Sequence, residues 1–359
     1  MGRERRALTT VGTDEALLDA LERSAVFQAI GETPLVGLEN LAATAGADTR
    51  RLYGKLEGAN PGGSIKDRIA RQILVDAIAS GRVTRDTVIV ESSSGNTAIG
   101  LAQLCATTGL RMICVIDART TATHRDLLRA YGVSTEVIDT PDPLSGEFLP
   151  ARLARVRQLL AEHPNSFWTN QYANEAVTSA HVSTTMPEIQ RALRRPPDYV
   201  YGAVSTCGTL AGCRQYVERN GWPTRIVAVD ILGSGIFGAK AKGNRTLPGM
   251  GAPYPPAFAA FLEKAHVIHV SEADCRAGCT RLLSSEGLMA GASSGAVVTA
   301  ALAHVETTPP GSTHVLLLPD RGERYLESVF LYDAKDAHEE HDVHEAHDMP
   351  GARVPGAAS

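Results

Sequence analysis

The stretch Asn60-Pro61-Gly62-Gly63-Ser64-Ile65-Lys66-Asp67-Arg68 is the most informative part of this sequence. Its turn-forming start ends the apolar segment Leu52–Leu56, and Ser64 can cap a helix that stops at Gly81. Lys66 then lies in the first turn of this helix, where the helix dipole disfavours a protonated amine. A neutral amine is what Schiff-base chemistry with a carbonyl cofactor requires. The alternative is an ordinary surface lysine on an amphipathic helix, and three later loops bear on this choice.

Composition excludes several classes of protein. The chain has 359 residues, 43% of them hydrophobic, which is enough for a sizeable core in two domains. Because the net charge is −5 and neither sign is concentrated, we expect no nucleic-acid partner and no membrane partner. No apolar run approaches the roughly 18 residues that span a bilayer, and Met1–Arg6 lack a following secretion-signal segment. The six cysteines form no CxxC or zinc pattern, so we expect a cytoplasmic protein without a metal site.

From Arg51 onward, apolar strands alternate with helices over short connections. The first series of expected elements covers 52–56, 65–80, 87–90, 96–108, 112–116, 123–131, 135–138 and 147–162. The second series covers 167–169, 178–194, 199–204, 209–219, 225–231, 267–270, 272–286, 294–304 and 315–318. Strand–helix alternation of this kind predicts an α/β fold with two open, twisted parallel-sheet domains and a cleft between them.

The chain divides into five expected parts. These are an N-terminal arm (1–24), a crossover segment packing on the second domain (25–47), a smaller α/β domain (48–174), a larger α/β domain (175–331) and a tail (332–359). The tail is acidic and carries His338, His341, His344 and His347 between Glu and Asp residues. Because it has few apolar residues to bury, we expect a disordered, solvated tail rather than a weak metal site.

Three loops place hydroxyl and amide groups at helix starts. Residues 91–97 (Glu-Ser-Ser-Ser-Gly-Asn-Thr), here called the 91–97 loop, are suited to a carboxylate or a phosphate. Residues 205–209 (Ser-Thr-Cys-Gly-Thr), here called the 205–209 cup, are suited to a dianionic phosphate. In the third loop, Gly291–Ala296, Ser293 can hydrogen-bond a ring nitrogen or only cap its helix.

Together, the helix-start lysine, the two anion loops and the late serine resemble the fold-type II pyridoxal-phosphate enzymes of the cysteine synthase family. The resemblance runs from about Gly31 to Leu326. It is carried by Gly-Glu-Thr-Pro-Leu at 31–35, the Lys66 motif, Ser-Gly-Asn-Thr at 94–97, Asn-Gln-Tyr at 170–172, Gly-Met-Gly at 249–251 and Gly-Glu-Arg-Tyr-Leu at 322–326. It implies pyridoxal 5′-phosphate in the cleft, small amino-acid substrates and a homodimer.

The same resemblance implies a role for each matching residue. Lys66 would form the Schiff base and move the substrate α-proton, Asn96 would bond the cofactor's 3′-oxygen, and Ser293 would face its ring nitrogen. The cofactor phosphate would be held by Ser205, Thr206, Cys207, Gly208 and Thr209. The substrate α-carboxylate would be held by Ser93, Ser94, Thr97 and Gln171. A serine facing the ring nitrogen leaves it largely unprotonated, which suits β-elimination.

Departures from the family pattern point to a subgroup. Cysteine synthases usually carry Gly-Thr-Gly-Gly-Thr in the cup, so Ser205 and Cys207 replace glycines; Cys207 is either a nucleophile or a small side chain that fills the loop. Segment 141–156 can bring Arg152 to the cleft mouth, where it binds a substrate phosphate or stays solvated. With segments 168–174, 229–234, 243–249 and 318–325, these features resemble the 2,3-diaminopropionate-pathway synthases. In that subgroup the positions matching Arg152, Tyr172 and Ser205 recognise O-phospho-L-serine.

This resemblance implies a β-replacement in which phosphate leaves O-phospho-L-serine and the amino group of L-glutamate takes its place. The product, N-(2-amino-2-carboxyethyl)-L-glutamate, would need an oxidative partner enzyme to yield 2,3-diaminopropionate for a siderophore or peptide natural product. The alternatives are a cysteine synthase that uses sulfide with O-acetylserine or O-phosphoserine, and a lyase or dehydratase acting on serine. A dinucleotide-binding interpretation of residues 233–238 is weak, because no helical periodicity follows them.

Overall fold

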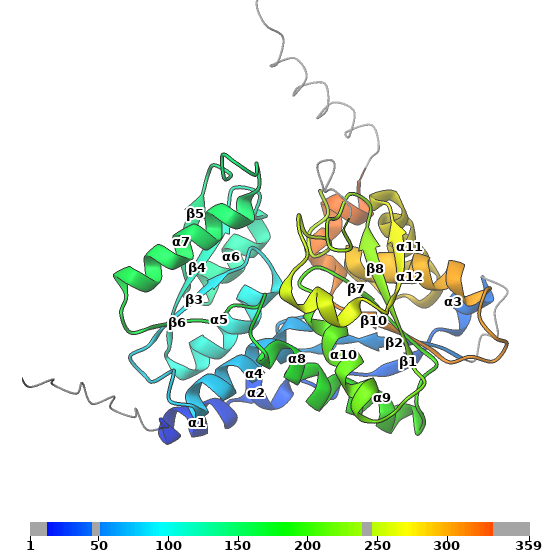
Figure 1. The fold of residues 1–359 in the computed structure, drawn as a ribbon, viewed down its shortest axis with the longest axis horizontal. Coiled ribbons are helices and arrows are strands. Elements are labelled where there is room, and N and C mark those ends of the chain that lie inside the picture. Colours follow the sequence, from blue (N-terminus) through cyan, green and yellow to red (C-terminus); the bar gives the residue numbers. More distant parts are fainter. Residues whose placement is uncertain (1–12, 45–50, 239–245, 333–359) are drawn as a thin grey trace, which may run out of the picture.

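The computed structural model describes residues 13–44, 51–238 and 246–332, which form two lobes, each with its own sheet (Figure 1). The six-stranded sheet has the order β1-β2-β10-β7-β8-β9 and contains β1 (Leu35–Gly37), β2 (Leu52–Leu56), β7 (Tyr199–Ala203), β8 (Arg225–Ile231), β9 (His266–Val270) and β10 (His314–Leu318). The four-stranded sheet has the order β5-β4-β3-β6 and contains β3 (Val88–Ser92), β4 (Arg111–Asp117), β5 (Ser134–Ile138) and β6 (Ser166–Trp168). All pairs are parallel except β1–β2. The predicted α/β fold with two open parallel sheets is confirmed.

Helices cover both faces of the larger sheet, because alternate residues of each strand point to opposite faces. Tyr199 and Tyr201 of β7 pack in one buried cluster with α11 (Glu272–Glu286) and α12 (Ala292–Val305). Val200 between them packs in another cluster with the helices α8 (Ala176–Ala180) and α10 (Gly208–Arg219). The strands are apolar on both faces, as parallel strands buried between helix layers require.

The smaller sheet is covered in the same way. One face packs against α1 (Glu15–Glu22), α4 (Lys66–Ala79), α5 (Asn96–Thr108) and α6 (Ala122–Ala130). The other face packs against α7 (Phe148–Glu162), which buries Val156 and Leu159. Asp14 caps α1, whose Leu17 and Leu21 are fully buried, so this part of the N-terminal arm belongs to the smaller lobe.

The sheet topology corrects the expected start of the smaller domain. From the sequence, residues 48–174 are expected to form that domain, but β2 pairs with β1 and β10 in the larger sheet. Strand pairing joins segments far apart in sequence, so a local apolar pattern does not reveal the partner. The expected crossover segment 25–47 is also shared: α2 (Ala25–Ala29) packs against the smaller lobe, whereas α3 (Glu39–Ala43) packs on α11.

Helix α4 joins the two lobes, because it packs on α5 of the smaller lobe and on α8 near the larger one (Figure 1). Two residues after its start, Arg68 is fully buried and pairs with Glu57 at 2.7 Å and with Glu188 at 2.6 Å. Lys55 of β2 also pairs with Glu188, at 2.6 Å. Burial lowers the pKa of Arg68, but the two carboxylates outweigh it and the pKa is raised. This buried charge network fixes the first turn of α4.

The helix expected at 178–194 is interrupted. Between α8 and α9 (Met186–Leu193) the chain forms a π-helical segment, η3 (His181–Thr185). This wider turn was not predicted, because the apolar pattern of the sequence fits a continuous helix. The remaining short helical pieces are η2 (Glu57–Ala59), η4 (Ala257–Leu262), η5 (Gly322–Tyr325) and η6 (Leu326–Phe330). Of the expected disordered tail (332–359), residues 333–359 lie outside the described residues, as do residues 239–245. Within the described ranges, no helix is long and apolar enough to cross a membrane.

Candidate active site

One cavity of about 390 Å³ is lined by loops of both lobes. It lies at the ends of β3, β4 and β7, where parallel strands present their carboxyl ends to a ligand. Every predicted site residue lines it, namely Lys66, Ser93, Ser94, Asn96, Thr97, Arg152, Gln171, Tyr172, Ser205, Thr206, Cys207, Gly208, Thr209 and Ser293. The structure therefore brings them together, while their individual roles stay predictions.

Lys66 is the first residue of α4. Its backbone N–H donates to Ser64 Oγ at 3.2 Å, so Ser64 stabilises the helix start, although the capping position itself is Ile65. Burial lowers the pKa of the Lys66 amine, and the nearby Asp320 carboxylate opposes this effect. Desolvation thus favours the neutral amine that Schiff-base chemistry needs.

Asn96 is held by residues from the segment that follows β10. Its Nδ2 donates to Asp320 Oδ2 at 2.7 Å, and its Oδ1 accepts from Arg324. Asp320 Oδ2 also accepts from the Tyr325 hydroxyl at 2.5 Å, whereas its Oδ1 is buried without a hydrogen-bond partner in the described part of the chain. One amide hydrogen of Asn96 remains for a ligand. Sequence reasoning gave Asp320 no role, although a carboxylate just beyond the end of a central strand was the available signal.

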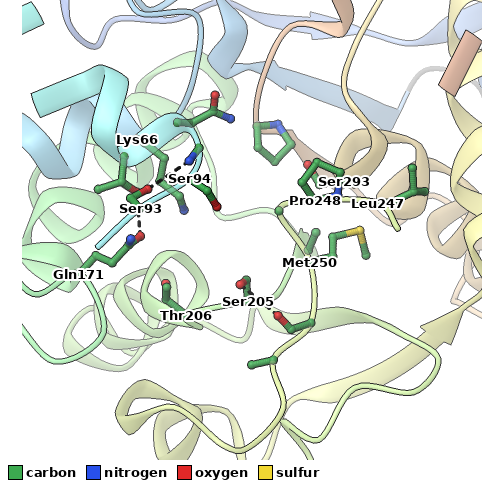
Figure 2. A pocket seen from close by; sticks show the side chains of 18 of the residues that line it. Lys66, Ser93, Ser94, Gln171, Ser205, Thr206, Leu247, Pro248, Met250 and Ser293 are labelled. Carbon is green, nitrogen blue, oxygen red and sulfur yellow. Dashed lines mark hydrogen bonds between the residues drawn. The ribbon is translucent and has the colours of Figure 1, made fainter. Parts of the chain in front are cut away.

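The 91–97 loop is connected to its neighbours by side-chain hydrogen bonds. Thr97 Oγ1 donates to Gln171 Oε1 at 2.7 Å, and Gln171 Nε2 donates to the Ser92 carbonyl at 3.3 Å. Figure 2 shows Ser93 and Ser94 beside Lys66, across the cavity from Ser205 and Thr206. Beneath the loop, burial raises the pKa of Glu91 to about 7, opposed by hydrogen bonds from Thr169 and two backbone N–H groups. Sequence reasoning also missed Glu91 as the support of this loop.

Arg152 reaches the cavity from α7 and is only 8% exposed, unlike a solvated helix arginine. Its Nη1 donates to Ser94 Oγ at 3.2 Å, and its Nε lies 3.4 Å from Asp117 Oδ2. Tyr172 lines the same part of the cavity, and burial raises the pKa of its hydroxyl to about 12, so it stays a hydrogen-bond donor. A guanidinium and a phenol are thus both available to an anionic group.

The 205–209 cup lies between β7 and the start of α10. Ser205 Oγ donates to the Gly251 carbonyl at 3.2 Å, and Thr209 Oγ1 lies 3.2 Å from His181 Nε2 of η3. A Cβ at Gly208 would meet Val177 Cγ1 at 2.3 Å, so this position requires glycine. The cup presents hydroxyl groups and the N–H groups of a helix start, which together suit a phosphate.

Cys207 adopts a left-handed conformation, with φ of 65°, where a glycine would be unstrained. Its side chain packs in the buried cluster of α8 and α10, and burial raises the pKa of its thiol to about 12. A nucleophilic cysteine needs a thiolate, so these surroundings favour the loop-filling interpretation of Cys207.

Pyridoxal phosphate fits this donor set. The cup offers hydroxyl and N–H donors and contains no carboxylate, Lys66 has a lowered pKa, and Ser293 is buried at the start of α12. Asp320, whose buried Oδ1 has no hydrogen-bond partner in the described part of the chain, lines the same cavity and interacts electrostatically with Lys66. Two parallel-sheet lobes enclosing a helix-start lysine and a phosphate cup define a fold-type II pyridoxal-phosphate enzyme.

Comparisons with known proteins agree with this class. The profile of the family described as pyridoxal-phosphate dependent enzyme matches residues 26–320. The chain is 44% identical over 306 residues to N-(2-amino-2-carboxyethyl)-L-glutamate synthase of Ralstonia nicotianae (strain ATCC BAA-1114 / GMI1000), covering 85% of this chain and 89% of that protein. Its fold matches a crystal structure of O-ureido-L-serine synthase with a TM-score of 0.77 and 29% identity. The match covers 88% of this chain and 98% of that one. It also matches the crystal structure of O-acetyl serine sulfhydrylase isoform 3 from Entamoeba histolytica with a TM-score of 0.76 and 29% identity. That match covers 86% of this chain and 92% of the other.

The chain therefore belongs to the pyridoxal-phosphate-dependent enzyme family. It is an enzyme that uses pyridoxal 5′-phosphate and catalyses a β-replacement.

Proposed function

We propose that the β-replacement uses O-phospho-L-serine as donor and L-glutamate as acceptor, giving N-(2-amino-2-carboxyethyl)-L-glutamate and phosphate. The observation that carries this proposal is Arg152, a buried arginine in the same cavity as Lys66. Asp117 lies 3.4 Å from its Nε, whereas its Nη1 donates only to the neutral Ser94 hydroxyl, so further N–H groups of the guanidinium are available to a phosphate, which accepts two hydrogen bonds from an arginine at once. The product named for the relative from Ralstonia nicotianae gives independent support.

The donor would be bound at both of its anionic ends. Arg152 and the Tyr172 and Ser205 hydroxyls lie where they can bind its phosphate. Its α-carboxylate would be bound by donors of the 91–97 loop and by Gln171. Because Ser205 belongs to the 205–209 cup, the proposed site for the leaving phosphate adjoins the cup, and one cavity would accommodate both the cofactor phosphate and the leaving phosphate.

Bound pyridoxal phosphate supplies an electron sink that stabilises negative charge at the substrate Cα. Lys66, with its lowered pKa, takes the α-proton as a neutral amine and returns it after the acceptor has added. Arg152 stabilises the departing phosphate, whose charge grows as the C–O bond breaks. Asp320 faces the lysine and favours the protonated amine between these two transfers. As further parts of this proposal, the enzyme acts as a homodimer, and an oxidative enzyme converts the product to 2,3-diaminopropionate for a siderophore or peptide natural product.

The likeness to an O-acetyl serine sulfhydrylase supports one alternative, a cysteine synthase that uses sulfide. Sulfide needs no acceptor pocket, so the acceptor has to be tested directly. A buried arginine at the leaving-group position does not serve a neutral acetyl ester, and this favours the phosphorylated donor.

The test mixes the cofactor-loaded enzyme with O-phospho-L-serine or O-acetyl-L-serine in the absence of acceptor. A burst of about one phosphate per active site, followed by turnover when L-glutamate is added, supports the proposal. The Lys66→Ala variant should lose the burst by a factor of about 1000 or more, since it lacks the base. Faster reaction with O-acetyl-L-serine, with turnover restored only by sulfide, would establish the cysteine synthase instead.

A further inference from the structure

One end of the cavity is not used by the proposed donor. It is formed by the end of β4 at Asp117, by Arg119, Thr120 and Thr121 after it, and by the first turn of α6. Arg119 and His124 both line this end. A helix start offers N–H groups that lack intrahelical partners, and α6 is nine residues long.

Arg119 supplies a cation without a counter-ion. Its guanidinium lies over the Phe148 ring, 4.9 Å from the centroid, which fixes it beside α7. In the described part of the chain, no carboxylate lies within ion-pair distance of it. Asp117 is occupied, because it accepts the Arg119 backbone N–H at 3.0 Å and lies 3.4 Å from Arg152. Glu147, half-buried ahead of α7, is the other carboxylate at this end.

His124 supplies an unsatisfied polar atom. It is 3% exposed, and its Nε2 is buried without a hydrogen-bond partner among the residues described. Burial, with a smaller effect of Arg324, lowers its pKa to about 4, so the ring is neutral. Thr121 Oγ accepts the His124 backbone N–H at 3.4 Å and lies 2.8 Å from Nδ1. When the hydroxyl donates to Nδ1, the proton is on Nε2, which becomes a donor.

We infer that Arg119, His124 and the first turn of α6 form a carboxylate site that binds a dicarboxylic amino-acid acceptor. The inference rests on the proposed function, because it concerns the second substrate of the same cavity. A cation, an imidazole N–H and helix-start amides are the donors that bind a carboxylate. Anchored by one carboxylate there, an acceptor would direct its amine towards the centre of the cavity near Lys66.

The site would affect acceptors unequally. An amino acid needs its amine oriented towards the β-carbon, and an anchored carboxylate reduces the cost of that orientation. Sulfide has nothing to orient and gains nothing from the site. An acceptor with an amide in place of the carboxylate would gain less from Arg119, because the charge interaction is lost.

The experiment uses the cofactor-loaded Arg119→Met variant, which keeps a long side chain over Phe148 but removes the charge. Phosphate release from O-phospho-L-serine is measured without acceptor, and then with L-glutamate, L-glutamine or sulfide. We expect the half-saturating L-glutamate concentration to rise about tenfold or more, the preference for L-glutamate over L-glutamine to fall, and the sulfide reaction to stay within about twofold. Arg129→Met is the matched control, since Arg129 lies on the exposed side of α6, away from the cavity lining, and pairs with Asp126.

The outcomes are distinguishable. A normal phosphate burst with unchanged L-glutamate saturation overturns the acceptor site and leaves the proposed function standing. An equal loss with sulfide and L-glutamate makes Arg119 structural and also overturns the site. A wild-type enzyme without any burst overturns the proposed function, and the acceptor site with it. His124→Asn serves as a second variant, and a raised L-glutamate requirement with a normal burst supports the site.

Discussion

The 91–97 loop and the 205–209 cup are built alike but fixed differently. Each follows a parallel strand, opens a helix and offers hydroxyl groups to the cavity. The loop is held by side chains from distant segments, namely Arg152, Gln171 and Asp320. The cup relies on the start of α10, on a glycine packed against Val177, and on contacts of Ser205 with the Gly251 carbonyl and of Thr209 with His181.

This difference separates two kinds of recognition. Under the proposed roles, the cup binds what every reaction of the fold needs, the cofactor phosphate, whereas exchangeable side chains around the loop bind what varies, the substrate. Substitutions around the loop should therefore alter substrate choice or the ionisation of buried groups. Substitutions within the cup should mainly change local backbone strain and packing.

The largest expected effect comes from removing the loop's arginine. Arg152→Ala should lower kcat/KM for O-phospho-L-serine about 100-fold, or about 3 kcal/mol, because the buried cation proposed to bind the leaving phosphate is lost. The value for O-acetyl-L-serine should change far less. Steady-state kinetics with both donors measures this. Arg157→Ala, an exposed position of the same helix, is the control, and equal losses for both donors would contradict a phosphate-binding role.

An intermediate effect is expected at Glu91. Burial raises its folded-state pKa to about 7, above the 4.5 of an unperturbed glutamate. Ionising this carboxyl therefore destabilises the folded state as the pH rises from 4.5 through 7. Relative to wild type, Glu91→Gln should gain about 2 kcal/mol of unfolding free energy between about pH 5 and pH 8.

Urea unfolding of the cofactor-loaded proteins at both pH values measures the effect of Glu91. Glu263→Gln, at an exposed position, should leave the pH dependence unchanged. A constant difference between Glu91→Gln and wild type across this range would show that Glu91 ionises normally, and that the loop is not built over a protonated carboxyl.

The smallest effect is expected within the cup. Cys207→Gly relieves a left-handed conformation worth about 1 kcal/mol and loses a buried thiol worth about as much. The substitution should therefore change the unfolding free energy, measured by thermal unfolding, by less than about 1 kcal/mol, and the phosphate burst should survive. A loss of the burst above about tenfold would instead assign chemistry to the thiol.

Local patterns predicted much of the fold and the site. Apolar strands, glycine stops and loops at helix starts located most of the strands and helices, and the family resemblance supplied the cavity residues named from the sequence. They did not place β2 in the larger sheet, because its partner β10 lies near the far end of the described chain. The π-helical turn at His181 was missed because its visible features are the His181 side-chain contacts with Thr185 and Thr209. The sequence periodicity does not reveal such contacts.

The missed site residues share one physical property. Asp320, Glu91 and His124 are polar but buried, and a sequence alone does not distinguish a buried polar side chain from an exposed one. Their importance comes from the atoms around them, such as the Asn96 amide against Asp320. Only the assembled structure brings those atoms together.

The buried charge network also bears on when, during folding of the chain, the helix start that carries Lys66 takes its final position. Arg68 and Glu188 are 120 residues apart in sequence, and an isolated buried ion is strongly unfavourable. A growing chain that ends before η3 lacks Glu188, so the first turn of α4 cannot yet take its final position. Because Glu188 lies just past the midpoint of the 359-residue chain, we expect the helix start that carries Lys66 to reach its charge-balanced position only after about half of the polypeptide is available to fold.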